Sequence, residues 1–193
     1  MPPKAKFTKD EVIAAAVKLT EERGIDALTA RELGDALGSS ARPIFTVFDG
    51  MDEVRDCVFA AAKAVYGEYV ERGLREAVAF KGVGAAYIKF AAERPRLFSL
   101  LFMRGRDGLP CVGEILPIID DYAERILTSI TDGYGVSREF AQRVYLHLWI
   151  YTHGIATLIA TKVCAFTAEE IDVLMTEEFL AIFSKLKKEG GKL

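Results

Sequence analysis

Residues 8–54 read TKDEVIAAAVKLTEERGIDALTARELGDALGSSARPIFTVFDGMDEV, and this stretch decides the fold. It contains two helix-start signals of one kind, in which a threonine is followed three residues later by a glutamate: Thr8 with Glu11, and Thr29 with Glu32. In such a capping box each side chain bonds a free backbone N–H group of the first helical turn. The stretch therefore predicts two helices in quick succession.

Two glycines, Gly24 and Gly38, follow these helices at positions typical of helix C-termini. A third short segment then offers Ser39 and Ser40 as an N-cap and places Pro43 in the first helical turn, where its missing N–H costs little. The pattern predicts a helix-turn-helix unit, although any small three-helix bundle would share it. Further helices are predicted over residues 51–76, 80–94, 95–103, 113–132, 138–163 and 168–187.

Length and charge limit the possible functions. The chain has 193 residues, of which 51% are hydrophobic and 27% are charged, and these values are typical of a globular protein with one or two domains. We predict domains at residues 1–50 and 51–193. The net charge of −3 excludes nucleic-acid binding through bulk positive charge. Residues 1–50 hold seven Lys/Arg and eight Asp/Glu, so few phosphates can be neutralised per subunit.

The remaining composition points to the cytoplasm. Three widely spaced cysteines, without a CxxC pair, predict neither a disulfide framework nor a zinc site. The polar, basic start lacks the apolar run of a secretory signal. Residues 144–161 carry no Asp, Glu, Lys or Arg, but they include two histidines and three threonines. We therefore expect a buried core or interface helix there and no membrane segment.

No pattern of residues indicates catalysis. The two histidines, His147 and His153, are six residues apart and cannot both hold one metal ion from a single helix face. The chain has no nucleophile elbow, metalloprotease motif or phosphate-binding loop. Asp120 and Asp121 are adjacent, which favours a solvated pair over a carboxylate dyad. We expect no enzymatic activity, no metal and no cofactor.

The opening stretch resembles the DNA-binding domain of the tetracycline-repressor (TetR) family over residues 8–54. A second region resembles a C-terminal ligand-binding domain of part of that family, sometimes named for its Trp-His-Gly signature. The first resemblance is carried by Ala15-Ala16, Leu19, Glu22-Arg23-Gly24, Leu28-Thr29, Arg31-Glu32-Leu33-Gly34, Leu37-Gly38, Ser40, Ile44-Phe45, Phe48 and Glu53-Val54. The second is carried by Phe90-Ala-Ala-Glu-Arg-Pro-Arg-Leu-Phe98, Trp149 and His153-Gly154.

The resemblance implies an all-α regulator whose recognition helix, Ser40 to Val47, enters the major groove of an operator. The family usually has Tyr where Phe45 stands and Lys where Met51 stands, and both usually contact phosphates. It also usually has a bulky aromatic residue at Thr20 and a small residue at Pro43. The expected DNA-binding residues are Lys6, Thr29, Arg31, Ser40, Arg42, Phe45 and Thr46, with Lys4 and Lys9 completing a basic arm.

Aromatic residues gather in the C-terminal part of the chain, where plain core packing is the alternative to a ligand pocket. We expect a mostly apolar effector, aromatic or acyl-bearing, between the 51–76, 80–94, 113–132 and 138–163 helices. His153 is expected on the same face as Trp149, with polar roles also for tyrosine hydroxyls. The predicted effector-binding residues are Tyr66, Tyr87, Phe90, Phe98, Phe102, Tyr122, Tyr145, Trp149 and His153.

The last helix carries an apolar stripe that predicts a homodimer interface: Ile171, Met175, Phe179, Ile182 and Phe183. The sequence thus predicts a cytoplasmic, homodimeric repressor that a small effector releases from a pseudo-palindromic operator. The alternative is a helical dimer that binds a small molecule or protein partner but has lost operator binding. Phe45, Met51 and the acidic balance of residues 1–50 motivate that alternative.

Overall fold

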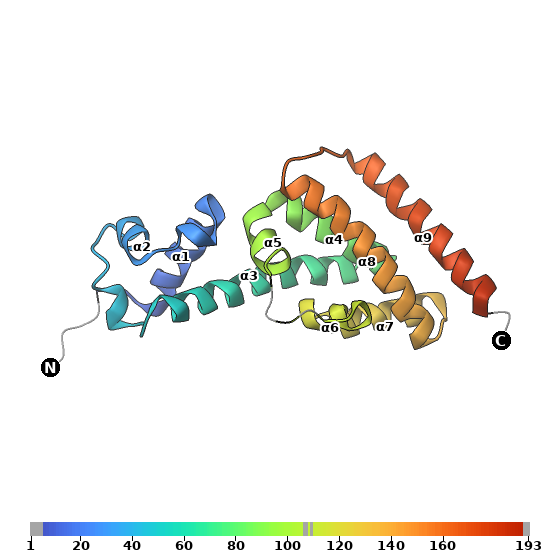
Figure 1. Ribbon diagram of the computed structural model, residues 1–193, viewed down its shortest axis with the longest axis horizontal. Coiled ribbons are helices and arrows are strands. Elements are labelled where there is room, and N and C mark those ends of the chain that lie inside the picture. Colours follow the sequence, from blue (N-terminus) through green and yellow to red (C-terminus); the bar gives the residue numbers. More distant parts are fainter. Residues whose placement is uncertain (1–5, 106–107, 109, 191–193) are drawn as a thin grey trace. The chain divides into compact units, whose positions relative to one another are not determined.

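The computed structural model describes residues 6–105, 108 and 110–190. In that part of the chain it contains α-helices and short 3₁₀-helices and no β-strand, which confirms the predicted all-α fold (Figure 1). Lys4 lies outside the described residues. The chain divides into an N-terminal unit, Met1–Tyr66 with Arg94–Arg104, and a C-terminal unit, Gly67–Glu93 with Gly105–Leu193.

The first two helices of the N-terminal unit begin as predicted. Helix α1, Lys9–Arg23, follows Thr8, whose Oγ1 accepts the Glu11 N–H at 3.2 Å, while Glu11 Oε2 accepts the Thr8 N–H at 2.8 Å. Helix α2, Ala30–Ala36, follows Thr29, whose Oγ1 accepts a backbone N–H of the first turn. The capping box of α1 is reciprocal as predicted, whereas at α2 only the Thr29 half of the predicted box is present and the Glu32 carboxylate bonds Arg23 instead.

The turn after α2 packs directly against that helix. A Cβ atom added at Gly34 would lie 2.9 Å from the Ala41 backbone nitrogen, so only glycine allows this approach. Gly38 adopts φ of +63°, in the left-handed region that glycine tolerates best. The two glycines therefore set the tight turn that separates α2 from the next segment.

The predicted recognition helix over Ser40 to Val47 is wrong in its form. The structure has a three-residue 3₁₀-helix, η2, over Ile44–Thr46, with Pro43 as its N-cap and no side-chain cap from the serines. Proline disfavours helical geometry in the residue before it, so the chain enters the segment as a turn. Ile44 is fully buried and anchors the segment to the unit.

Helix α3, Met51–Leu74, is the longest in the chain and contributes to both units. Helix α5, Pro95–Phe102, begins with proline in its first turn and packs on α1 within the N-terminal unit. The predicted domain boundary between residues 50 and 51 stays a prediction. The core of the N-terminal unit includes the buried side chains of Val12, Leu28, Leu33, Ile44, Val54, Val58, Leu97 and Phe98.

The C-terminal unit is built around α8, which contacts three other helices of that unit, α4, α7 and α9. The predicted caps are present: Ser137 Oγ accepts the Phe140 N–H, and Thr167 forms a capping box with Glu170. No helix among the described residues is long and apolar enough to cross a membrane. The bounds are α4, Ala79–Glu93; α7, Ala123–Tyr134; α8, Arg138–Ala160; and α9, Ala168–Gly190.

The single helix predicted over residues 113–132 is wrong, because the chain breaks before α7. A 3₁₀-helix, η3 (Val112–Glu114), leads into α6 (Ile115–Ile119), and Asp120 then leaves helical geometry with ψ of 109°. Its Oδ1 accepts the Tyr122 N–H at 2.8 Å, a bond that competes with continuation of the helix. Asp120 is buried, so the predicted solvated carboxylate pair is also wrong for this residue.

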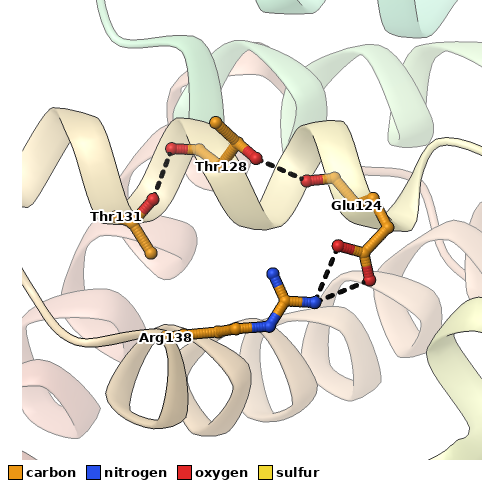
Figure 2. A network of polar contacts seen from close by, with 4 residues as sticks. All are labelled: Glu124, Thr128, Thr131 and Arg138. Carbon is orange, nitrogen blue, oxygen red and sulfur yellow. Dashed lines mark hydrogen bonds and ion pairs between the residues drawn. The ribbon is translucent and has the colours of Figure 1, made fainter.

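Polar contacts tie α7 to the start of α8 (Figure 2). Arg138 donates through Nη2 to both carboxylate oxygens of Glu124, at 2.8 and 2.7 Å. Thr128 and Thr131 instead donate to backbone carbonyls within α7, at 2.9 Å each. The Arg138–Glu124 pair is exposed, so its contribution to stability is small. Its role is to orient the first turn of α8 against α7.

Candidate functional site

The expected DNA-binding residues of the N-terminal unit lie on its surface. Arg31 is on α2, and Ser40, Arg42 and Thr46 are in or beside the turn that leads into η2; all four are exposed. Phe45 is 47% exposed, unusual for a phenylalanine in a small helical unit. Because Ile44 between them is buried, the segment presents Arg42, Phe45 and Thr46 outward together.

Three cations of this unit's first 50 residues are already paired with carboxylates. Lys9 is 2.6 Å from Glu53, Lys18 is 4.0 Å from Glu22, and Arg23 bonds Glu32. Among the described residues up to 50, Arg31 and Arg42 make no ion pair. Their guanidinium groups are therefore the cations of this surface that can bind a phosphate or a base edge without first breaking an ion pair.

The other predicted DNA contacts are partly engaged within the chain. Thr29 Oγ1 accepts the Glu32 N–H at 3.2 Å and keeps its own hydrogen for donation. Thr46 donates its hydroxyl hydrogen to the Pro43 carbonyl at 2.6 Å, so toward DNA it can act only as an acceptor. Lys6 Nζ donates to Ser39 Oγ at 2.9 Å. The Thr29 bond was predicted from the sequence as a helix cap, whereas the bonds of Thr46 and Lys6 were not, because they depend on the turn geometry.

The predicted effector-binding residues fall into two groups, one in each unit. In the N-terminal unit, the Tyr66 and Phe102 ring centroids are 5.0 Å apart, and those of Phe98 and Phe102 are 5.5 Å apart. Each group is therefore described within the unit that holds it. The C-terminal unit holds the others: Tyr87, Phe90, Tyr122, Tyr145, Trp149 and His153.

A cluster of polar aromatic residues links α4 to α8 in the C-terminal unit. Tyr87 Oη and His153 Nδ1 form a hydrogen bond at 2.9 Å. The Trp149 ring stacks on the His153 ring, with centroids 5.1 Å apart and an interplanar angle of 19°, which confirms that both residues share a helix face. When Tyr87 donates, the imidazole proton is on Nε2, where it can serve as a donor.

Burial controls the protonation of this cluster. It raises the pKa of the Tyr87 hydroxyl well above its ordinary value, and the Asp120 carboxylate raises it further. The pKa of Tyr145 is raised by the same two causes in the same order. Burial lowers the pKa of His153, so its ring is neutral at pH 7. The cluster is therefore an uncharged set of donors and acceptors beside a buried carboxylate.

Two other predicted members are packing residues. Phe90 is fully buried and packs edge-on against Tyr69, with centroids 5.2 Å apart. Tyr122 directs its hydroxyl at the α3 backbone, where a Cβ added at Gly67 would lie 2.1 Å from Tyr122 Oη. Phe90 is enclosed by core, and the close approach at Gly67 fixes Tyr122. Both contacts agree with core packing, the alternative left open by the sequence, and an effector-binding role for Phe90 and Tyr122 stays a prediction.

Three buried polar atoms of α8 have no partner with hydrogen-bond geometry among the described residues: Tyr145 Oη, Trp149 Nε1 and Thr157 Oγ1. A looser side-chain hydrogen bond with Trp149 opposes the rise in the Tyr87 pKa, and one with Asp120 adds to the rise in the Tyr145 pKa, so of the three atoms Thr157 Oγ1 is the one without a partner of either kind among the described residues. Sequence reasoning missed Thr157 and Asp120. The spacing of four residues from Tyr145 through Trp149 and His153 could have identified Thr157.

The predicted dimer residues of α9 are placed largely in the chain's own core. Met175, Phe179, Ile182 and Phe183 pack against the buried side chains of α8 and of Leu186, and Ile171 is half-buried. Phe179 also contacts the rings of Phe80 and Tyr134. Their role in a dimer stays a prediction. The large apolar side chains exposed on α8 and α9 are Ile150, Leu158, Val173 and Leu180.

No group of three or more His, Cys, Asp or Glu side chains that could hold a metal ion occurs within residues 6–105, 108 and 110–190.

Comparisons with known proteins identify the family. Residues 12–56 match the family model described as bacterial regulatory proteins, tetR family. Residues 80–180, just over half of the chain, match the tetracyclin repressor-like C-terminal domain. No curated protein sequence matches the chain.

The fold is also similar to a solved structure, that of the fatty acid degradation regulator FadR from Bacillus halodurans. The two chains are 14% identical, the match covers 90% of this chain and 93% of that one, and the TM-score is 0.52. This likeness concerns the fold alone. The two family matches, together with the helix-turn-helix and the helical C-terminal unit, show that the chain belongs to the TetR family of DNA-binding transcription regulators.

Proposed function

We propose that this protein is a repressor that binds a pseudo-palindromic operator as a homodimer and leaves it when a small effector binds the C-terminal unit. The observation that carries the proposal is the pair of exposed arginines, Arg31 and Arg42, which have no ion pair on a surface where Lys9, Lys18 and Arg23 are paired with carboxylates and Lys6 bonds Ser39. Such a surface has little non-specific attraction for DNA, because most of its charge is neutralised. The two arginines can still make directed contacts with phosphates or bases.

The outward side chains around η2 suit contact with base edges. Arg42 can donate two parallel hydrogen bonds to guanine, and the exposed Phe45 ring can pack against a thymine methyl group. Phenylalanine cannot bond a phosphate, so Phe45 contributes apolar contact in place of the usual hydroxyl. Affinity should then depend on both subunits binding together.

The dimer is proposed to form through the outer surfaces of α8 and α9. Ile150 is 50% and Leu180 is 56% exposed, and Gly154 lies on the same exposed side of α8 as Ile150 and Leu158. Side chains repeat there at three- to four-residue spacing, which suits helix-to-helix packing, and the exposed glycine allows close approach. This outer surface is separate from the α9 stripe predicted from the sequence, which packs against the chain's own core.

The effector is proposed to be a small, mostly apolar compound. The C-terminal unit offers aromatic walls and an uncharged polar cluster, as described for Tyr87 and His153. The FadR structure of similar fold is named as a fatty acid degradation regulator, which agrees with an acyl-bearing effector. Such a ligand would bury its apolar surface and use few polar contacts for orientation.

The test is a mobility shift on DNA flanking the protein's own gene. We expect wild type to bind and Arg42→Ala to lose about 1–3 kcal/mol if Arg42 makes a bidentate base contact. Lys18→Ala is the matched control, because Lys18 is exposed but lies 4.0 Å from Glu22. Equal loss across sequences would assign Arg42 to a phosphate.

Phe45→Tyr combined with Met51→Lys restores the family's usual phosphate contacts and should tighten binding. If neither wild type nor this double variant shifts any DNA, operator binding is excluded. The alternative, a helical dimer that binds a small molecule or protein partner, would then replace the proposal.

A further inference from the structure

The outer face of α9 changes its charge along the helix. Its exposed residues turn through about 140° of the helix circumference at 3.6 residues per turn. From the N-terminal end they are Glu169, Glu170, Val173, Thr176, Glu177, Leu180, Ala181, Ser184, Lys187 and Lys188. The first half of this face carries carboxylates and no cation, and the second half carries ammonium groups and no carboxylate. Two large apolar side chains, Val173 at 48% and Leu180 at 56% exposed, lie between charged residues.

The charges beside this face are paired within the subunit, whereas those on it are not. Asp172 is 2.6 Å from Lys81, and Glu189 is 2.8 Å from Arg143. Four charged residues of the outer face make no ion pair within the described part of the chain: Glu169, Glu177, Lys187 and Lys188. The unpaired charges of α9 are therefore concentrated on the side that faces away from its own subunit.

A second α9, antiparallel across a two-fold axis, matches these charges. Glu169 with Lys188, and Glu170 with Lys187, share one midpoint, which lies between residues 178 and 179. A two-fold axis at that point places each carboxylate opposite an ammonium group of the other helix, because a two-fold contact repeats itself with the residues exchanged. Parallel helices would instead place like charges opposite each other, which is unfavourable.

The same axis brings an apolar side chain to a hollow in the surface. Val173 and Ser184 share that midpoint too, so the partner's valine would lie opposite the serine. An open hollow of about 360 Å³ is lined there by Ala181, Ser184, Lys185, Lys188 and Glu189. A valine side chain can enter it, and the symmetry provides this contact twice. Burial of the valine favours association, while the charges fix direction and register.

Helix α8 offers no other match for the acidic half of α9. Its two arginines, Arg138 and Arg143, already bond Glu124 and Glu189. Residues 144–161 carry no Lys or Arg. The exposed apolar side chains of α8 can add contact area, but they do not specify a direction. The cations that can meet the acidic half of α9 are thus those of a second α9.

We propose that two copies of the chain pair through antiparallel α9 helices, in a register that places Glu169 opposite Lys188 and Val173 opposite Ser184 of the partner subunit. This inference rests on the proposed function, since it names the register of the same dimer. It goes beyond that function, because exposed apolar surface alone permits either direction of pairing.

The first experiment determines the register by disulfide cross-linking. Full-length protein with the exposed Cys111 and Cys164 changed to serine carries Val173→Cys, Ser184→Cys or both. Mild oxidation should convert the double variant into covalent dimers at least tenfold more than either single variant. In this register, residue 173 is about 16 Å along the axis from its own copy, beyond the reach of a disulfide. Equal cross-linking of a single variant, or none of the double variant, would overturn the register.

The second experiment measures the dimer dissociation constant at low ionic strength by sedimentation equilibrium. Glu169→Lys and Lys188→Glu should each weaken the dimer about three- to tenfold, because each places like charges opposite each other. Both changes in one chain should restore the wild-type value within about twofold. The two positions are about 28 Å apart along one helix, so restoration has to come from contact between subunits.

Net charge alone predicts a different result. The chain carries a net charge of −3, so Glu169→Lys lowers the repulsion between subunits and would tighten the dimer if only net charge mattered. Tighter dimerisation of Glu169→Lys, or a double variant as weak as the two changes added together, overturns the proposed pairing.

The outcomes separate this inference from the proposed function. A wild-type dimer that binds its operator but shows neither cross-link nor charge restoration removes the register alone. A dimer with the proposed register that shifts no DNA sustains the pairing and removes the repressor function. A wild-type protein that sediments as a monomer removes both.

Discussion

The two sides of α8 invert the usual arrangement of a surface helix. Its outer side exposes large apolar residues, with Ile150 at 50% and Leu158 at 38%. Its inner side buries hydrogen-bonding groups, among them the Tyr145 hydroxyl beside Asp120 and the Trp149 indole N–H beside Tyr87. An ordinary amphipathic helix shows polar groups to water and apolar groups to the core. The outer side of α8 is therefore apolar and uncovered, whereas the inner side carries a polar cluster bonded largely within the subunit.

The two sides of α8 differ in chemistry, and the sequence alone did not distinguish them. An uncharged run from 144 to 161 indicates only that the helix is covered on several sides. The structure places Val144 and Leu148 with the chain's own core and leaves Ile150 outside. The outer side suits a second copy, while the polar atoms of the inner side suit a ligand. Changes on the two sides should thus alter different measurements.

The largest effect is expected from a charge on the outer side. Ile150→Glu should give folded monomers, because a carboxylate buried in a helix-to-helix interface has no cation opposite it. Operator binding should fall with dimerisation. Sedimentation velocity gives the oligomeric state, and Gln142→Glu, which adds the same charge at an exposed polar position of α8, is the control. A dimeric Ile150→Glu protein would move the interface elsewhere.

A charge on the inward stripe should act differently. Phe179→Asp removes packing against Phe80 and Tyr134, so it should lower the free energy of unfolding of the subunit itself, by about 3–5 kcal/mol. Urea unfolding followed by circular dichroism measures this loss. The comparison fails if Phe179→Asp yields monomers of unchanged stability, since Phe179 would then face a partner subunit.

Parts of this molecule that depend on local bonds could be predicted from the sequence. The starts of α1 and α9 have threonines and glutamates three residues apart that bond as the pattern predicts, and at α2 the Thr29 hydroxyl bonds as predicted. The bond lies between near neighbours, so no tertiary contact is needed to anticipate it.

Other parts of the fold depend on a competition between the helix and a local alternative conformation, which the apolar spacing does not reveal. The apolar spacing of 113–132 predicts one helix, but the Asp120 carboxylate bonds the Tyr122 N–H and ends α6. Likewise, Pro43 changes an expected helix into a turn with a short 3₁₀-helix. In both cases one residue offers the backbone a local alternative to the helix.

The shared face of Trp149 and His153 could be predicted from the sequence, whereas the surroundings of these side chains could not. Trp149 and His153 were expected on one face, and they stack. Thr157 was missed because threonine is common in helices, and only tertiary packing shows that its hydroxyl is buried without a partner. The exposure of Ile150 could not be predicted either, because an apolar residue within an apolar stretch is expected to be buried.

A smaller effect on the inner side should appear as pH dependence. Burial lowers the pKa of His153 from its ordinary value of 6.5, so the folded state resists a proton that the unfolded chain accepts. The free energy of unfolding should therefore fall as pH is lowered through 6.5 toward the folded-state pKa. Urea midpoints between pH 7.5 and 5.5 measure this slope.

His153→Gln should flatten that slope, whereas His147→Gln, which alters the other histidine of the chain, should keep it. His147 is exposed and lies on the outer side of α8. An unchanged slope in His153→Gln would show that His153 is not protected from protonation, and the neutral polar cluster would lose its support.

The smallest effect compares two threonines of α8. Thr152 Oγ1 donates to the Leu148 carbonyl at 2.6 Å, while Thr157 Oγ1 is buried and unbonded. Thr152→Val removes a hydrogen bond and should cost about 0.5–1.5 kcal/mol in the free energy of unfolding. Thr157→Val removes an unpaired polar atom at nearly constant shape, so in ligand-free protein it should be neutral or stabilising by up to about 1 kcal/mol. The two variants share the same chemical change, helix and propensity, so urea midpoints at one pH isolate the hydrogen-bond term. If Thr157→Val costs as much as Thr152→Val, an ordered water already occupies the Thr157 hydroxyl, and the inner side of α8 needs no ligand to complete it.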